Sequence, residues 1–150
     1  MASTSRPPVR ISAQQEAYLA IARTEAMVSD ALEATLKAHG LSRAQYNVLR
    51  ILRGAGGEGL CRNEIRDRLL SRMPDVTRLL DRMEEAGWLA RERREDDRRQ
   101  VGTRLTASGR ALVDRLDPII DAEHRAHFAA LSPAELDTLQ RLLARVRGGA

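Results

Sequence analysis

The stretch PDVTRLLDRMEEAGWL, residues 74–89, carries the most regular pattern in this sequence. Its apolar residues recur at the spacing i, i+3, i+4, i+7, which places them along one face of an α-helix. These residues are Val76, Leu79, Leu80 and Met83. Pro74 is typical of a first helical position, and Gly87 is typical of the residue just beyond a helix. We therefore predict a helix over residues 74–86.

The other face of this predicted helix is polar and carries arginines. Its residues are Asp75, Arg78, Asp81, Arg82 and Glu85, with Thr77 at the margin of the apolar face. A shorter helix is predicted from residue 61, where Glu64 has the position of the acid in a capping box. The apolar face of that helix is expected to hold Ile65, Leu69 and Leu70. Two short helices joined by a tight turn, the second with arginines on its outer face, are typical of a helix-turn-helix.

The periodicity changes after this helix. Residues 88–93 and 101–105 alternate between apolar and polar side chains as β-strands do. The loop REDDRRQ between them, residues 94–100, is too charged to be buried. A helix-turn-helix followed by a hairpin of this kind is a winged helix. The predicted fold is therefore mostly α with a small β-hairpin wing.

Long helical segments flank this centre. The apolar spacing predicts one helix over residues 13–39 and another over 107–130, in which Pro118 should either kink the helix or remove one backbone hydrogen bond. The segment Ser132-Pro133-Ala134-Glu135 combines a capping box with proline at the first helical position, so it opens a last helix. A first helix of about 25 residues is long for a small domain. We expect it to extend past its own core and to leave apolar residues that need a partner.

These elements divide the chain into a short arm and one domain. We expect residues 1–12 to form a flexible N-terminal arm and residues 13–150 to form the domain. Within it, residues of about 42–106 form the winged-helix lobe, and helices of about 13–39 and 107–147 form a dimerisation lobe. We predict a homodimer. The alternative is a monomer whose terminal helices pack only on their own core.

Composition narrows the functional classes. The chain has 150 residues, 43% hydrophobic and 31% charged, as expected for one soluble globular domain. Its one cysteine, Cys61, permits no internal disulfide, and no apolar run has the length of a membrane span, so we expect a cytoplasmic protein without a membrane partner. No Walker loop, GxSxG or HExxH motif is present. We therefore predict neither an enzyme nor a bound cofactor.

The charge and the aromatic content point to a duplex rather than to single-stranded nucleic acid. The formal net charge is +4, and every basic residue except Lys37 and the histidines is arginine. Arginine is preferred for phosphate and base-edge recognition, although a coding bias would produce the same count. Aromatic residues make up 3% of the chain, which argues against rows of stacking rings for unpaired bases.

Several ordered motifs resemble those of MarR-type regulators. They are Leu41-Ser42 with Gln45-Tyr46, then Val76-Thr77-Arg78-Leu79-Leu80-Asp81-Arg82-Met83-Glu84, Gly87-Trp88-Leu89 with Arg91, Asp97-Arg98-Arg99, and Leu105-Thr106 with Gly109. The terminal helices fit that family's dimerisation lobe, so the resemblance covers nearly the whole chain. It implies a homodimeric winged-helix transcriptional repressor that binds pseudo-palindromic double-stranded DNA and is released by a small-molecule effector.

The resemblance places the outer face of the 74–86 helix in the DNA major groove. The residues expected to contact DNA there are Arg72, Asp75, Thr77, Arg78 and Arg82. Asp75 and Thr77 stand near the helix start, within reach of base edges or phosphates. Arg78 and Arg82 suit guanine or backbone contacts. The alternative is a solvated face with ion pairing along the helix, where Arg78 has Asp81 close by.

The resemblance also assigns a role to the tip of the hairpin. Arg98 or Arg99 is expected to enter a minor groove, where a narrow A/T-rich stretch concentrates negative potential. We favour Arg99 for the insertion and Asp97 as its brace through a charge-assisted hydrogen bond. The alternative is an ordinary charged hairpin tip.

A different class of function rests on the histidines and the cysteine. His124 and His127 share one helix face beside Glu123, and His39 could approach them, so that three donors could hold zinc. The alternative function is a metal-responsive or helical protein-interaction module with little DNA specificity, in which the winged helix is vestigial. The set of ligands is incomplete, so we predict no metal site. Cys61 stands at a helix start, but the chain has no second cysteine that could form a disulfide with it in a redox switch. MarR-type proteins that sense peroxide usually carry a cysteine near the start of the first helix, and this chain has none there.

Overall fold

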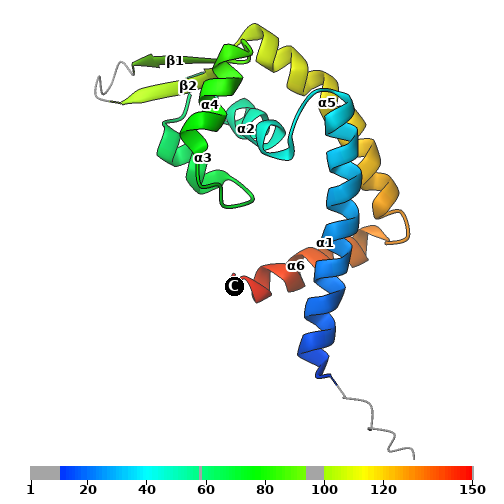
Figure 1. Cartoon of the computed structure of the whole chain (residues 1–150). Helices are drawn as coiled ribbons and strands as arrows, with labels where there is room; N and C mark the ends of the chain where they lie inside the picture. The colour runs from blue at the N-terminus through cyan, green and yellow to red at the C-terminus, as the bar shows by residue number, and fades with distance from the viewer. Residues whose placement is uncertain (1–10, 58, 94–99, 150) are drawn as a thin grey trace, which may run out of the picture.

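The computed structural model of the chain describes residues 11–57, 59–93 and 100–149. Its helices are α1 (Ala13–Ala38), α2 (Arg43–Gly54), α3 (Arg62–Arg68), α4 (Val76–Glu85), α5 (Ala107–His127) and α6 (Pro133–Val146), and its strands are β1 (Leu89–Arg93) and β2 (Val101–Leu105). In Figure 1, α2, α3, α4 and the strands gather into one lobe, the winged lobe. The helical lobe consists of α1, α5 and α6, in which α1 packs against α5, and α6 follows the C-terminal end of α5 and crosses α1 in this view. The predicted helical fold with a small hairpin is confirmed, and residues 1–10 of the predicted arm lie outside the described residues.

Helices α2 and α6 begin at the capping boxes that their sequences carry. In α2 the Ser42 hydroxyl accepts the Gln45 N–H at 3.2 Å, and the Gln45 side chain accepts the Ser42 N–H at 2.9 Å. In α6 the Glu135 carboxylate accepts the Ser132 N–H at 2.8 Å, which confirms the predicted box. This backbone hydrogen bond holds the pKa of Glu135 below its usual range.

Two details of the helix-turn-helix prediction are wrong. The second helix begins at Val76 rather than at Pro74, because Asp75 has non-helical backbone angles and its carboxylate caps the helix by accepting the Arg78 N–H at 2.9 Å. Leu70 is 88% exposed and does not belong to the apolar face of the preceding helix. That helix ends at Arg68, and the extended backbone of its C-cap, Leu69, carries the next residue away from the core.

The core lies in the winged lobe and continues along α5. Its fully buried side chains include Leu36 of α1, Val48 and Leu49 of α2, Ile65 of α3, Leu80 and Met83 of α4, and Val113, Leu116 and Ile120 of α5. Burying one such side chain stabilises the fold by about 1.5–3 kcal/mol. The four apolar residues predicted for one face of α4 are all buried, which fixes the opposite face of this helix toward solvent.

A close backbone contact joins α5 to the base of the wing. The Thr106 hydroxyl donates to the Gly87 carbonyl at 2.6 Å and accepts the Gly109 N–H at 3.0 Å. A Cβ atom at position 109 would lie 2.1 Å from the Trp88 carbonyl oxygen, so only glycine fits there. From this contact α5 continues as one helix through Pro118, whose missing N–H removes one hydrogen bond.

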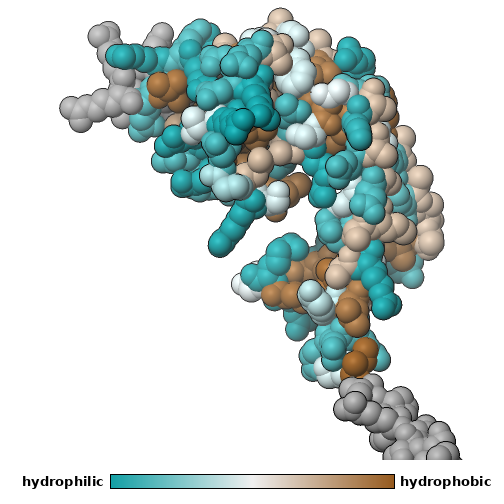
Figure 2. All heavy atoms as spheres, viewed as in Figure 1, coloured by the Kyte–Doolittle hydropathy of each residue, from teal (hydrophilic) through white to brown (hydrophobic). Residues whose placement is uncertain are grey.

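The helical lobe leaves many apolar side chains uncovered. No residue of α6 is buried, and Leu142 and Val146 are 52% and 76% exposed. On α1 the exposed apolar residues include Tyr18 and Met27. Figure 2 shows hydrophobic atoms at the surface over α6 and the lower part of α1. Among the described residues, no helix is both long and apolar enough to cross a lipid bilayer.

Candidate nucleic-acid interface

Helix α4 presents a polar face to solvent, as its sequence predicts. Thr77, Arg78, Asp81 and Arg82 are all exposed on it. Their direction follows from the burial of the other face, since the apolar residues of α4 leave no freedom to rotate the helix about its axis. This face therefore has the position that a helix needs in order to enter a groove.

Two of the acidic residues of α4 form ion pairs with the wing. Arg91 of β1 contacts Asp81 at 2.5 Å and Glu84 at 3.2 Å. Asp81 thus pairs with the wing rather than along the helix with Arg78. Within the described parts of the chain, Arg78 and Arg82 make no ion pair, so both guanidinium groups stay available to an anion. The same contacts hold β1 against α4.

Two of the residues predicted to contact DNA already have a partner within the chain. The Asp75 carboxylate caps α4 through the Arg78 N–H. The Thr77 hydroxyl accepts a hydrogen bond from the Arg62 guanidinium at 3.0 Å. Arg72 lies outside α4, exposed in the turn that precedes it. The structure therefore places four of the five predicted contacts on α4 or at its cap and one in the turn.

Arg62 is a candidate that the sequence did not single out. It is the first residue of α3, and its hydrogen bond to Thr77 spans 15 positions of the chain. Only its place at the start of a helix, where the backbone attracts phosphate, gave a signal in the sequence. The contact with Thr77 brings one more guanidinium to the start of α4.

The wing is a regular antiparallel hairpin. Its strands pair from Leu89 opposite Leu105 to Arg93 opposite Val101. Leu60 adds a short bridge to Thr103, with backbone hydrogen bonds of 2.9 and 2.8 Å. The residues predicted for the tip, Asp97, Arg98 and Arg99, lie outside the described residues. The base of the wing is thus fixed to the winged lobe on two sides, by Leu60 and by α4.

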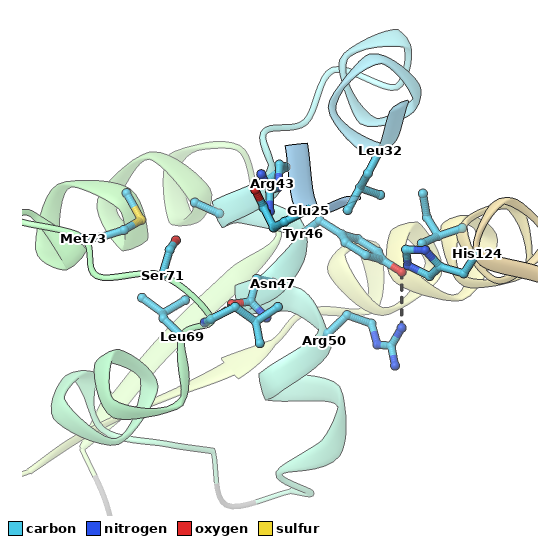
Figure 3. Close-up of a pocket in the computed structure, with 13 residues that line it drawn as sticks. Glu25, Leu32, Arg43, Tyr46, Asn47, Arg50, Leu69, Ser71, Met73 and His124 are labelled. Carbon is cyan, nitrogen blue, oxygen red and sulfur yellow. Dashed lines mark hydrogen bonds and ion pairs between the residues drawn. The ribbon is translucent and has the colours of Figure 1, made fainter. Parts of the chain in front are cut away.

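A cavity of about 380 Å³ lies between the two lobes. Its wall combines apolar side chains with polar ones from α1, α2, α5 and the turn after α3 (Figure 3). Among the residues that line it are Leu32, Tyr46, Arg50, Met73 and His124. A mixed lining of this size suits a small organic molecule with a few polar groups.

One wall of the cavity is held by a polar contact between α1 and α2. The Glu25 carboxylate accepts the Ser29 hydroxyl and lies 3.5 Å from the Arg43 guanidinium (Figure 3 shows Glu25 and Arg43). The hydrogen bond from Ser29, followed by the charge of Arg43, holds the pKa of Glu25 below its usual range.

The histidines do not complete a metal site. In residues 11–57, 59–93 and 100–149, no group of three histidine, cysteine or acidic side chains is placed to hold a metal ion. The Nδ1 atoms of His124 and His127 are buried without a hydrogen-bond partner. Cys61 is partly buried at the N-cap of α3, where its backbone N–H donates to Glu64 at 2.7 Å, as the predicted capping box requires.

Comparison of the sequence with known proteins finds transcriptional regulators. The family model described as the MarR family matches residues 39–100. The chain is 34% identical over 126 residues to the HTH-type transcriptional regulator YkoM of Bacillus subtilis, covering 84% of this chain and 80% of that protein.

Comparison of the structure agrees. A mutant of E. coli MarR in complex with operator DNA superimposes with a TM-score of 0.74 and 27% identity, over 84% of this chain and 89% of that one. BpsR of Bordetella bronchiseptica, whose DNA binding is regulated by 6-hydroxynicotinic acid, superimposes with a TM-score of 0.75 and 26% identity, over 89% of this chain and 98% of that one.

Proposed function

The chain belongs to the MarR family of transcriptional regulators, and from this premise we propose that it binds a pseudo-palindromic DNA operator as a homodimer. It is a regulator and not an enzyme. The observation that carries the proposal is the charge of α4: Arg91 takes up both Asp81 and Glu84, while Arg78 and Arg82 stay exposed. An arginine that can reach a guanine edge supplies about 1–3 kcal/mol of discrimination between bases. The E. coli MarR structure with operator DNA supports the same use of the fold.

The uncovered residues of the helical lobe support the homodimer. Leu142 and Val146 of α6 and Met27 of α1 expose apolar surface that one chain does not bury. A two-fold pair of chains would cover such surface and would present two α4 helices to half-sites about 10 bp apart. Because this chain would act on chromosomal DNA, we place it in the cytoplasm.

Repression with release by a small molecule fits the cavity. A dimer that occupies an operator blocks the access of polymerase to the same DNA. The cavity lies between the lobe that carries α4 and the helices assigned to the dimer, so a molecule bound there contacts both. BpsR, which is regulated by a small aromatic acid, supports an effector of comparable size for this chain.

The test measures affinity for a selected DNA sequence. Genomic fragments enriched by the protein are sequenced, and a duplex carrying the enriched site is compared with a scrambled duplex by fluorescence anisotropy. We expect Arg78→Ala to weaken binding to the selected duplex by about 1–3 kcal/mol. Arg125→Ala removes the same charge from the far end of α5 and should change the affinity little.

Two results would argue against this function. Equal affinity of the wild-type protein for selected and scrambled duplexes would favour a protein-interaction module without DNA specificity. If the Arg78→Ala variant binds the selected duplex with wild-type affinity, Arg78 does not contribute to the interface. The dimer is tested separately, because a sedimentation mass of one chain at micromolar concentration contradicts it whatever the protein does with DNA.

A further inference from the structure

Asp117 of α5 gathers three donors from α2. Its carboxylate accepts a hydrogen bond from the Tyr46 hydroxyl at 2.8 Å and lies 3.4 Å from the Arg50 guanidinium. Arg53 also pairs with this carboxylate and reaches Asp114 at 3.1 Å. The Asp117 side chain is only 20% exposed, so its charge is less screened by water than that of a surface ion pair. We call Asp117, Tyr46, Arg50 and Arg53 the Asp117 cluster.

The Asp117 cluster connects the two lobes. Its three donors belong to α2, which packs against α5 as well as against α3, α4 and β2 of the winged lobe. Its acceptor belongs to α5, which continues into the helical lobe. A change in this cluster therefore alters how α4 is held relative to α5 and α6.

The same cluster forms part of the cavity wall. Tyr46 and Arg50 line the cavity, and Ile120 and His124 line it from the face of α5 that also carries Asp117. Figure 3 shows the Tyr46 ring directed toward His124, and the Arg50 guanidinium donates a hydrogen bond to the Tyr46 hydroxyl. A molecule in the cavity meets two of the donors on which Asp117 depends.

The helix is weakened next to this cluster. Pro118 has no N–H, so the Asp114 carbonyl receives no hydrogen bond from the position four residues later. The Asp117 side chain thus holds α5 next to the point where the helix backbone lacks one hydrogen bond.

We propose that Asp117 is a positioning residue for DNA binding: it holds the winged lobe in one orientation on α5. The effect on DNA affinity rests on the proposed function. The effect on orientation does not, because it concerns the arrangement of the two lobes within one chain.

The experiment compares two matched substitutions. Asp117→Asn and Asp114→Asn make the same change of charge on the same helix, but Asp114 contacts only Arg53 of the cluster. The distance between the lobes is measured by pulsed electron spin resonance between labels at Glu85→Cys of α4 and Gln140→Cys of α6, in a Cys61→Ser background. Both labelled positions are exposed. Labelled chains are diluted with unlabelled protein, so the distance is that within one chain.

We expect Asp117→Asn to broaden the distance distribution and to weaken binding to the selected duplex by about five-fold or more. Asp114→Asn should keep the wild-type width and stay within about two-fold in affinity. Tyr46→Phe keeps the ring and removes one donor, so it should shift both readouts in the direction of Asp117→Asn, by less. It also serves as the test if Asp117→Asn fails to fold.

The proposal is overturned if Asp117→Asn, or Tyr46→Phe in its place, matches Asp114→Asn in either readout. If the wild-type protein binds no selected duplex, the proposed function fails, and the distance distribution alone then decides whether Asp117 positions the lobes.

Discussion

Helices α4 and α6 carry similar apolar stripes, but the stripe of α4 is buried and that of α6 is not. On α4 the stripe is buried within the chain, with Leu80 and Met83 at 2% and 0% exposure. On α6 no residue is buried, and Leu142 is 52% exposed. Helical periodicity therefore predicts that a face will be covered, but not whether the same chain supplies the cover. The apolar core of the winged lobe is covered within one chain, whereas the helical lobe leaves apolar side chains exposed.

The largest effect on stability should come from a substitution in the core of the winged lobe. Leu49 of α2 is fully buried, so Leu49→Ala should lower the free energy of unfolding by about 2–5 kcal/mol through lost burial and a cavity. Urea unfolding followed by circular dichroism measures this change. Leu70→Ala is the control, because Leu70 is 88% exposed and its loss should cost less than about 0.5 kcal/mol. Similar losses in the two variants would refute the assignment of the core.

A substitution on the exposed apolar face of the helical lobe should instead change the association of two chains. Leu142→Asp places a charge on the uncovered face of α6, which should prevent a second chain from packing there. We expect sedimentation to give the mass of one chain at a concentration where the wild type has the mass of two. Gln140→Asp introduces the same charge at an exposed polar position of α6 and should leave the wild-type mass. A two-chain mass for Leu142→Asp would place the dimer contact elsewhere.

A smaller effect tests how α6 is stabilised without buried residues. Ser132→Ala removes the hydroxyl that caps α6 and should cost about 1 kcal/mol. Hydrogen exchange of the α6 amides measures the loss locally. Ser132→Asn retains a capping oxygen and should restore most of the protection. If the alanine variant exchanges as slowly as the wild type, packing and not the cap stabilises this helix.

The smallest effect concerns the joint between α1 and α2. The pKa of Glu25 is lowered in the folded protein by Ser29 and Arg43, so the stability that this carboxylate contributes is complete above its unfolded pKa. The contribution is lost as the pH falls through the lowered folded value. Urea unfolding at steps from roughly pH 6 to pH 3 should show this loss, and Glu25→Gln should lack that component. An identical pH profile for the two proteins would contradict it.

Local patterns predicted most of the fold. The spacing of Val76, Leu79 and Met83 identified the buried face of α4, and the Ser132 and Glu135 pair identified the start of α6. Both signals act within one or two turns of helix, so they can be read from neighbouring residues. Asp75 shows the limit of such reading. The proline before it suggested an earlier helix start, but its capping hydrogen bond moves the first helical residue to Val76.

The candidate site was less predictable because its contacts join distant positions. The exposure of Arg78 and Arg82 followed from periodicity, but the pairing of Asp81 with Arg91 depends on how the hairpin leaves α4. The hydrogen bond between Tyr46 and Asp117 spans 71 positions and exists only because α2 crosses α5. No spacing within the sequence encodes such a meeting of two helices.

The length of α5 has a quantitative consequence. With 21 residues it is about 30 Å long, and it begins against the wing and ends near α6. A tilt of about 10° at its C-terminal end would displace the wing by about 5 Å, more than the rise of one base pair, roughly 3.4 Å. A rotation this small, applied at the far end of α5, therefore moves the wing by more than the spacing of two adjacent base pairs.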